Sequence, residues 1–220
     1  HGHDAFLIEF KQLEKLLNGI FNSNGKTKAV KVLKFGGKSL ANGKGIENVI
    51  GKIVAKVEQN ENIAIVVSAR GSSTDDLEEL LDLASQGKNY AKAFTRFEDY
   101  QKHEHKVNIS EELKELTKLL EGVALLGDYS PKIKDQVLAF GELISAKVLS
   151  TLLEKESINA KVLDTRKLLL TDSNFGSANV NEAMSKEKTY KAFSELDTDF
   201  TPIITGFIGA DSNGNTTTLG

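Results

Sequence analysis

A lysine, two glycines and a serine stand together in the hexapeptide Lys34-Phe35-Gly36-Gly37-Lys38-Ser39. Lysine supplies a positive charge for oxygens that become more negative during phosphoryl transfer, and glycines leave backbone N–H groups uncovered by side chains. The hexapeptide therefore has the parts of a phosphate site. It matches neither the Walker A pattern nor the GxGxxG fingerprint. On these residues alone, a tight turn with a solvated lysine is an equal alternative.

The elements around this hexapeptide indicate how it is positioned. Residues 30–35 form a β-rich run that ends at the two glycines, and the apolar residues of 46–57 then recur at helical spacing. A second strand is expected at 63–67, an unbroken apolar run, with further strands at 160–163 and 200–205. Strands that alternate with helices predict an α/β sandwich with a largely parallel sheet, in which ligands bind at the carboxyl ends of the strands.

Helical periodicity dominates between the second and third expected strands, up to about residue 157. Breaks at Gly87, 108–110 and 128–131 divide this stretch into three or four expected helices. Another helix is expected from about 180 to 196, between the last two strands.

Serine residues mark the expected starts of these helices. Ser110 and Ser130 are placed as N-caps, and Pro131 follows Ser130 at a first helical position. Ser73 stands three residues before Asp76, which gives a start resembling a capping box.

Six segments of the chain together match one family in order and spacing. They are Val32-Leu33-Lys34-Phe35-Gly36-Gly37-Lys38-Ser39, Val67-Ser68-Ala69 with Thr74, Gly141-Glu142, Asp164-Thr165-Arg166, Thr205-Gly206-Phe207-Ile208-Gly209 and Thr216-Thr217-Thr218-Leu219-Gly220. Residues 30–220 thereby resemble the N-terminal, aspartate-binding part of the catalytic domain of aspartate kinases. The resemblance implies the amino-acid-kinase fold, an α/β three-layer αβα sandwich with a mainly parallel sheet, truncated here at the C-terminus.

The resemblance also implies an activity, the transfer of the γ-phosphate of ATP to the β-carboxylate of L-aspartate, with Mg²⁺ as cofactor. Lys34 would contact the transferred phosphoryl group, and Glu142 would bind the ammonium group of the substrate. The aspartate pocket would be formed by Thr74, Glu142, Phe207 and Thr218. The phosphate and ATP pocket would be lined by Lys34, Gly36, Gly37, Ser39 and Ser68. No residue is assigned as a metal ligand.

Two of these site residues have ordinary structural alternatives. Glu142 lies in an expected helix with core-facing neighbours, so its carboxylate could be solvated or paired with Lys147. Thr74 could cap a helix.

Later in the chain, Phe207 could be a core residue. Asp164 and Arg166 are expected to pair across a turn, in a structural role, and are not assigned to the site. Lys38 departs from the family, in which threonine is usual, and it could add charge to the pocket or point outward.

The chain stops at Gly220, where the family continues with an arginine that holds the substrate carboxylate and then with the nucleotide-binding subdomain. Little or no activity is expected of the chain as given, because phosphoryl transfer depends on a complete set of positioned charges. Two other functions stay open. One is a different phosphotransferase of the same fold, and the other is a non-catalytic module that binds aspartate or docks to other domains.

Residues 1–22 do not fit the kinase pattern. Their first nine residues resemble the end of a homoserine O-acetyltransferase, in which His3 would be the triad histidine. By this resemblance, 1–22 would be the C-terminal helix remnant of a preceding acetyltransferase-like domain, and 23–29 would be a linker. The alternative is a remnant of an expression tag followed by a packing helix. For the parent protein, a homo-oligomer and fused catalytic domains, such as a bifunctional aspartokinase/homoserine dehydrogenase, stay open.

Composition excludes several other classes of function. The net charge of -3, from 28 basic and 31 acidic residues, gives no reason to expect a nucleic acid or an anionic membrane as partner. The absence of cysteine excludes disulfides and thiolate metal sites and fits the cytoplasm. No run approaches the roughly 18 apolar residues that a membrane-spanning helix needs.

Overall fold

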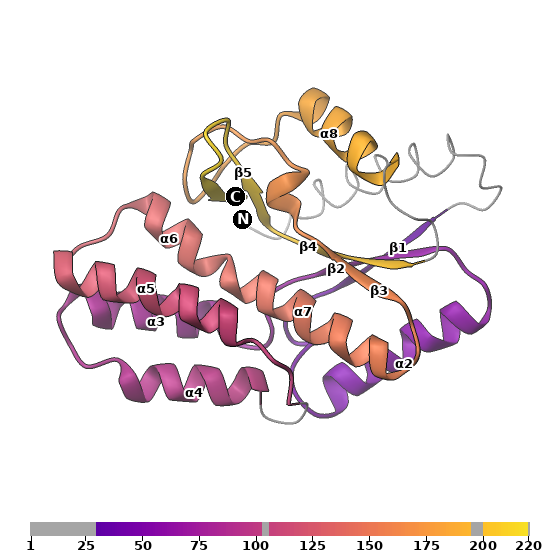
Figure 1. Ribbon diagram of the computed structural model, residues 1–220, viewed down its shortest axis with the longest axis horizontal. Helices are drawn as coiled ribbons and strands as arrows, with labels where there is room; N and C mark the ends of the chain where they lie inside the picture. Colours follow the sequence, from indigo (N-terminus) through magenta and orange to yellow (C-terminus); the bar gives the residue numbers. More distant parts are fainter. Residues whose placement is uncertain (1–29, 103–105, 195–199, 220) are drawn as a thin grey trace.

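The computed structural model describes residues 30–102, 106–194 and 200–219 (Figure 1). The interpretations of residues 1–22 as an acetyltransferase-like helix and of 23–29 as a linker therefore lie outside the described residues.

The centre of the fold is a four-stranded sheet in the order β1-β2-β4-β3. Its strands are β1 (Lys31–Phe35), β2 (Ile63–Val67), β3 (Ala160–Leu163) and β4 (Thr201–Thr205), and every neighbouring pair is parallel. All five residues of β2 are buried, as its unbroken apolar run predicted. The predicted parallel sheet is confirmed.

Helices cover both faces of this sheet (Figure 1). On one face lie α2 (Lys44–Glu58) and α7 (Phe140–Lys155), and on the other lies α8 (Glu182–Ser194). The first interface is an apolar cluster that includes Ile53, Ile65, Leu149 and Ile203. The second includes Val66, Phe193 and Ile204. The predicted three-layer αβα sandwich is thus confirmed.

The remaining helices pack beside the sandwich around a further apolar core, separate from the two clusters at the sheet. They are α3 (Ser73–Ser85), α4 (Ala91–Lys102), α5 (Ser110–Leu126) and α6 (Pro131–Leu138). With α7, the described residues of this stretch form five helices rather than the expected three or four, when α6 and α7 are counted separately on the two sides of Ala139. The additional break falls at Ala139, whose backbone stays helical (φ -58°, ψ -23°). Position 139 itself is neither glycine nor proline, and the helical spacing of apolar residues continues across it, so the sequence does not indicate this break.

Helices α6 and α7 together form the stretch Pro131–Lys155, which is long and apolar enough to cross a membrane by length and composition. Of its most apolar window, 72% is buried inside the protein. Its apolar residues therefore belong to the protein core.

The helix start at Ser130 is as predicted. Its hydroxyl accepts a hydrogen bond from the backbone N–H of Ile133 at 3.4 Å, and Pro131 is the first helical residue.

The other two predicted caps were wrong. The N-cap of α3 is Ser72, while the Ser73 hydroxyl is buried and donates to the carbonyl of Arg70 at 2.5 Å. The N-cap of α5 is Ile109, which has no capping side chain. In both cases the serine lies one residue inside the helix.

After β4 the chain forms an antiparallel hairpin of β5 (Ile208–Ala210) and β6 (Thr216–Thr218). Asp211 closes its turn, since its carboxylate accepts hydrogen bonds from the side chain and the backbone of Asn215, each at 2.9 Å. These bonds hold the pKa of Asp211 at about 2. The hairpin was not predicted, because glycines interrupt its short strands.

Candidate active site

The carboxyl ends of the four parallel strands meet at one edge of the sheet, where hydrogen bonds join the loops that follow them. These bonds run from Ser68 N to Phe35 O (3.2 Å), from Gly206 N to Val67 O (2.8 Å) and from Thr165 N to Thr205 Oγ1 (2.9 Å). Hydrogen bonds therefore connect the loops at the edge where α/β sheets bind ligands.

The glycine loop after β1 lies closely against the loop after β2. The Gly71 N–H donates to the Gly37 carbonyl at 2.9 Å, and a Cβ on Gly37 would lie only 2.6 Å from the Ala69 carbonyl oxygen. Only glycine fits at position 37 without a shift. Among the backbone hydrogen bonds found in the described residues, none uses the amides of Gly36, Gly37 or Lys38 as donor. Amides of this kind suit phosphate oxygens.

The two lysines of this region lie in different environments. Lys34 pairs with Val66 in the sheet, on the face that α8 covers, and partial burial lowers the pKa of its amine below the usual value. Lys38 is exposed at the outer side of the loop. Of the two alternatives for Lys38, the outward orientation agrees with this position.

Glu142 reaches the same edge from the first turn of α7. It is only 6% exposed, and its Oε1 accepts a hydrogen bond from the Ala69 N–H at 3.1 Å. Burial raises the pKa of Glu142 to about 7, although the hydrogen bond from Ala69 opposes this rise. The alternative of a solvated or Lys147-paired Glu142 was wrong, because the Lys147 amine binds Glu112 of α5 at 2.7 Å.

Gly141 allows this approach of α7. A Cβ at this position would lie 2.7 Å from the Ala69 Cβ, well inside van der Waals contact. In the Gly141-Glu142 pair, the glycine thus leaves space for the loop after β2, and the carboxylate accepts a hydrogen bond from that loop.

Phe207 follows β4 and has a left-handed backbone with φ +61°. Its carbonyl accepts a hydrogen bond from Leu219 N at 3.0 Å, so the end of β6 helps to hold this conformation. Phe207 is half-buried rather than a core residue. Strained backbone of this kind is concentrated at functional sites.

The hydroxyl residues assigned to the site differ in their surroundings. Thr74 is exposed in the first turn of α3 and does not cap this helix, since the cap is Ser72. Ser39 is exposed in the glycine loop, and Ser68 is half-buried directly after β2. Thr218 is 3% exposed. The roles assigned to all four remain predictions.

Sequence reasoning missed Asp135, which binds Thr218. This aspartate of α6 is 1% exposed, and it accepts hydrogen bonds from Thr218 Oγ1 at 2.7 Å and Thr218 N at 2.8 Å. It also accepts one from Gly176 N at 2.9 Å. A signal was present in the sequence, because Asp135 stands seven residues before Glu142, about two helical turns away on the same side of the helical stretch.

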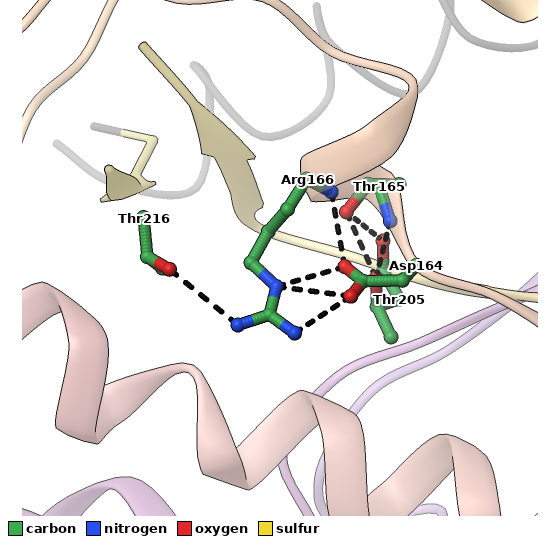
Figure 2. A network of polar contacts seen from close by, with 5 residues as sticks. All are labelled: Asp164, Thr165, Arg166, Thr205 and Thr216. Carbon is green, nitrogen blue, oxygen red and sulfur yellow. Dashed lines mark hydrogen bonds and ion pairs between the residues drawn. The ribbon is translucent and has the colours of Figure 1, made fainter. Parts of the chain in front are cut away.

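The predicted pairing of Asp164 and Arg166 is confirmed (Figure 2). Arg166 NH2 lies 2.6 Å from Asp164 Oδ2, at the start of the short helix η1 (Thr165–Lys167). Arg166 NH1 also donates to Thr216 Oγ1 at 3.4 Å, which ties the loop after β3 to β6. Beside this pair, Thr165 Oγ1 lies 2.8 Å from Thr205 Oγ1 (Figure 2).

Within the described residues, no group of three or more histidine, cysteine, aspartate or glutamate side chains could hold a metal ion.

The chain is thus a parallel α/β sandwich with a glycine-rich loop and a buried glutamate at the carboxyl edge of its sheet. The model of the amino acid kinase family matches residues 29–220, so the chain belongs to this family. Aspartokinases are among the relatives that it matches. One from Candida albicans is 26% identical, over 91% of this chain and 41% of its own length. The lysine-sensitive aspartokinase 3 of Escherichia coli is 28% identical, over 86% and 43%.

Solved structures give the same result. E. coli aspartokinase III in complex with aspartate and ADP is 25% identical and has a TM-score of 0.74, over 87% of this chain and 43% of that one. The same enzyme in complex with lysine and aspartate is 26% identical, with a TM-score of 0.71. The chain thus spans about two-fifths of the length of these relatives.

Proposed function

We propose that the chain is part of an ATP:L-aspartate phosphotransferase and forms the N-terminal, aspartate-binding part of its catalytic domain. The observation that carries this proposal is that the glycine loop after β1 and the buried Glu142 both contact the loop after β2, at the edge of the sheet where the strand with Lys34 ends. A relative with the same fold holds aspartate and ADP. The cysteine-free composition fits a cytoplasmic enzyme.

In the proposed reaction the β-carboxylate of aspartate attacks the γ-phosphorus of ATP, and ADP leaves. A carboxylate is already ionised at neutral pH, so the reaction needs no general base. Lys34 stabilises charge on the transferred group, and the amides of the glycine loop bind phosphate oxygens. Glu142 and Thr74 orient the acceptor, with Phe207 and Thr218 closing its pocket.

The residues present fit the phosphates of ATP. Gly37 leaves no room for a side chain against the Ala69 carbonyl, so the loop presents bare backbone amides beside Ser39 and Ser68. Bound Mg²⁺ would neutralise phosphate charge.

A second candidate is a non-catalytic module that binds aspartate. In this case Glu142 and Thr218 would bind aspartate, but phosphoryl transfer would not follow. A relative of the same fold with another acceptor is the third candidate.

A coupled assay of ADP release tests the three candidates. It is run with L-aspartate, L-glutamate and N-acetylglutamate, on the chain and on a polypeptide that continues beyond Gly220 through the arginine and aspartate expected from the family. Activity with aspartate supports the proposal. Activity with another acceptor supports the third candidate. If both polypeptides are inactive but bind aspartate by calorimetry, the binding module stands instead.

A further inference from the structure

Asp135 binds only hydrogen-bond donors. Its partners are the Thr218 hydroxyl at 2.7 Å and the backbone N–H groups of Thr218 and Gly176 at 2.8 and 2.9 Å. Among the ion pairs of the described residues, none includes Asp135. A buried carboxylate is thus satisfied entirely by two N–H groups and one O–H group.

This arrangement fixes the direction of the Thr218 hydroxyl. A threonine hydroxyl has one proton to donate and two lone pairs that accept, whereas a carboxylate can only accept. The proton of Thr218 therefore points to Asp135, and Thr218 Oγ1 can only accept from any other group. The other close hydroxyl pairs, Thr165 with Thr205 and Thr171 with Thr217, leave the donor undetermined.

Thr218 lies close in the fold to Phe207, another residue that we assign to the acceptor pocket. Thr218 lies opposite Ile208 in the hairpin, one residue from the strained Phe207. The next residue, Leu219, donates its N–H to the Phe207 carbonyl at 3.0 Å. Thr218 is 3% exposed, so only a small part of the residue is accessible.

The loop that contains Gly176 is bound to both residues. Gly176 N donates to Asp135, and Ala178 N donates to the Thr218 carbonyl at 3.0 Å. Asp135, Thr218 and this loop thus form a closed set of hydrogen bonds that keeps the hydroxyl in one orientation.

We propose that Asp135 is a positioning residue that makes Thr218 an obligatory acceptor, and so selects an acceptor substrate with an α-ammonium group. This inference rests on the proposed function. An ammonium group can only donate, so it matches the Thr218 oxygen, whereas succinate, the same four-carbon dicarboxylate without the amino group, gains nothing from it.

The test compares L-aspartate with succinate. Affinities are measured by calorimetry on the chain, and KM and kcat for aspartate on the extended polypeptide. The Asp135→Asn variant keeps the shape and one acceptor oxygen but turns an NH₂ group toward Thr218, which then donates into the pocket. We expect the preference for aspartate over succinate to fall by about tenfold or more, through KM rather than kcat.

Variants at position 218 separate this effect from a loss of structure. Thr218→Val should lower the preference to a similar degree, Thr218→Ser should keep it, and Asp135→Asn should add nothing in the Thr218→Val background. If Asp135→Asn fails to fold, the comparison of Thr218→Ser with Thr218→Val still tests the inference. An equal preference for aspartate over succinate in these two variants would overturn it.

An equal loss of affinity for aspartate and succinate in Asp135→Asn would show a merely structural role and would overturn the inference, while the proposed function stands. A wild-type chain that shows no preference for aspartate would overturn both.

Discussion

The Glu142 carboxylate and the Ala69 backbone amide lie 3.1 Å apart and join the start of α7 to the loop after β2. Two elements that are 73 residues apart in sequence meet in this contact. It places the buried Glu142 side chain at the edge of the sheet where the glycine loop after β1 also lies. Its consequences for stability and activity can be measured.

Glu142 should make stability depend on pH. Its pKa is about 7 in the folded protein and 4.5 in its unperturbed state. Between these values the folded protein holds a proton that the unfolded chain has lost, so the free energy of unfolding should fall as pH rises through this window, by up to about 3 kcal/mol, and level off above it. Urea unfolding at pH 5 and pH 8 measures the change.

The Glu142→Gln variant should abolish most of this dependence, because glutamine keeps the bond from Ala69 but does not titrate. Glu115→Gln, on the exposed side of α5, is the matched control and should leave the slope unchanged. A slope that survives in Glu142→Gln would show that another group carries the effect.

Gly141→Ala should destabilise the protein. The added Cβ would lie 2.7 Å from the Ala69 Cβ, and overpacking of this kind costs about 1–3 kcal/mol. Gly122→Ala in α5 meets nothing within 4 Å and should instead stabilise by about 0.5–1 kcal/mol, as alanine does in a helix. Chemical unfolding curves of both variants check this difference in sign. Equal effects would mean that α7 has room to move.

Lys34 and Lys38 should differ in their effect on turnover. Lys34→Ala should reduce kcat in the extended polypeptide by about 100-fold or more, because it removes a charge placed for the transferred phosphoryl group. Lys38→Ala should change kcat by less than about tenfold, because Lys38 is exposed and contributes through solvent-screened charge. The coupled ADP assay measures both, and the reverse order would show that the phosphate contact was assigned to the wrong lysine.

Two arginines should respond differently to replacement by lysine. Arg70 is 1% exposed, donates to the Leu40 carbonyl at 3.1 Å and also binds Asn42 and Gln101. Arg70→Lys should cost about 2–4 kcal/mol, since lysine cannot reproduce the planar fork. The Arg166 side chain is 31% exposed, so Arg166→Lys should cost less than about 1 kcal/mol.

Urea unfolding of both lysine variants at neutral pH provides the comparison. Similar small losses for the two would contradict a structural role for the buried Arg70 network.

The sequence by itself determined the layers and much of the candidate site. The unbroken apolar run of 63–67 and the helical period of 46–57 are local patterns, and they identify β2 and α2 because burial imposes a fixed period on each kind of element. The glycine loop and the Gly141-Glu142 pair could also be identified from the sequence, because each is a short motif of neighbouring residues.

Only the tertiary structure decided which side chains satisfy one another. Asp135 and Thr218 are 83 residues apart, so no local period connects them. The spacing of Ser73 and Asp76 resembles a capping box, but the buried Ser73 hydroxyl donates to the Arg70 carbonyl instead. The raised pKa of Glu142 follows from burial under neighbours distant in sequence. Periodicity reports which face is apolar, whereas hydrogen-bond partners and desolvation depend on where distant segments come to lie.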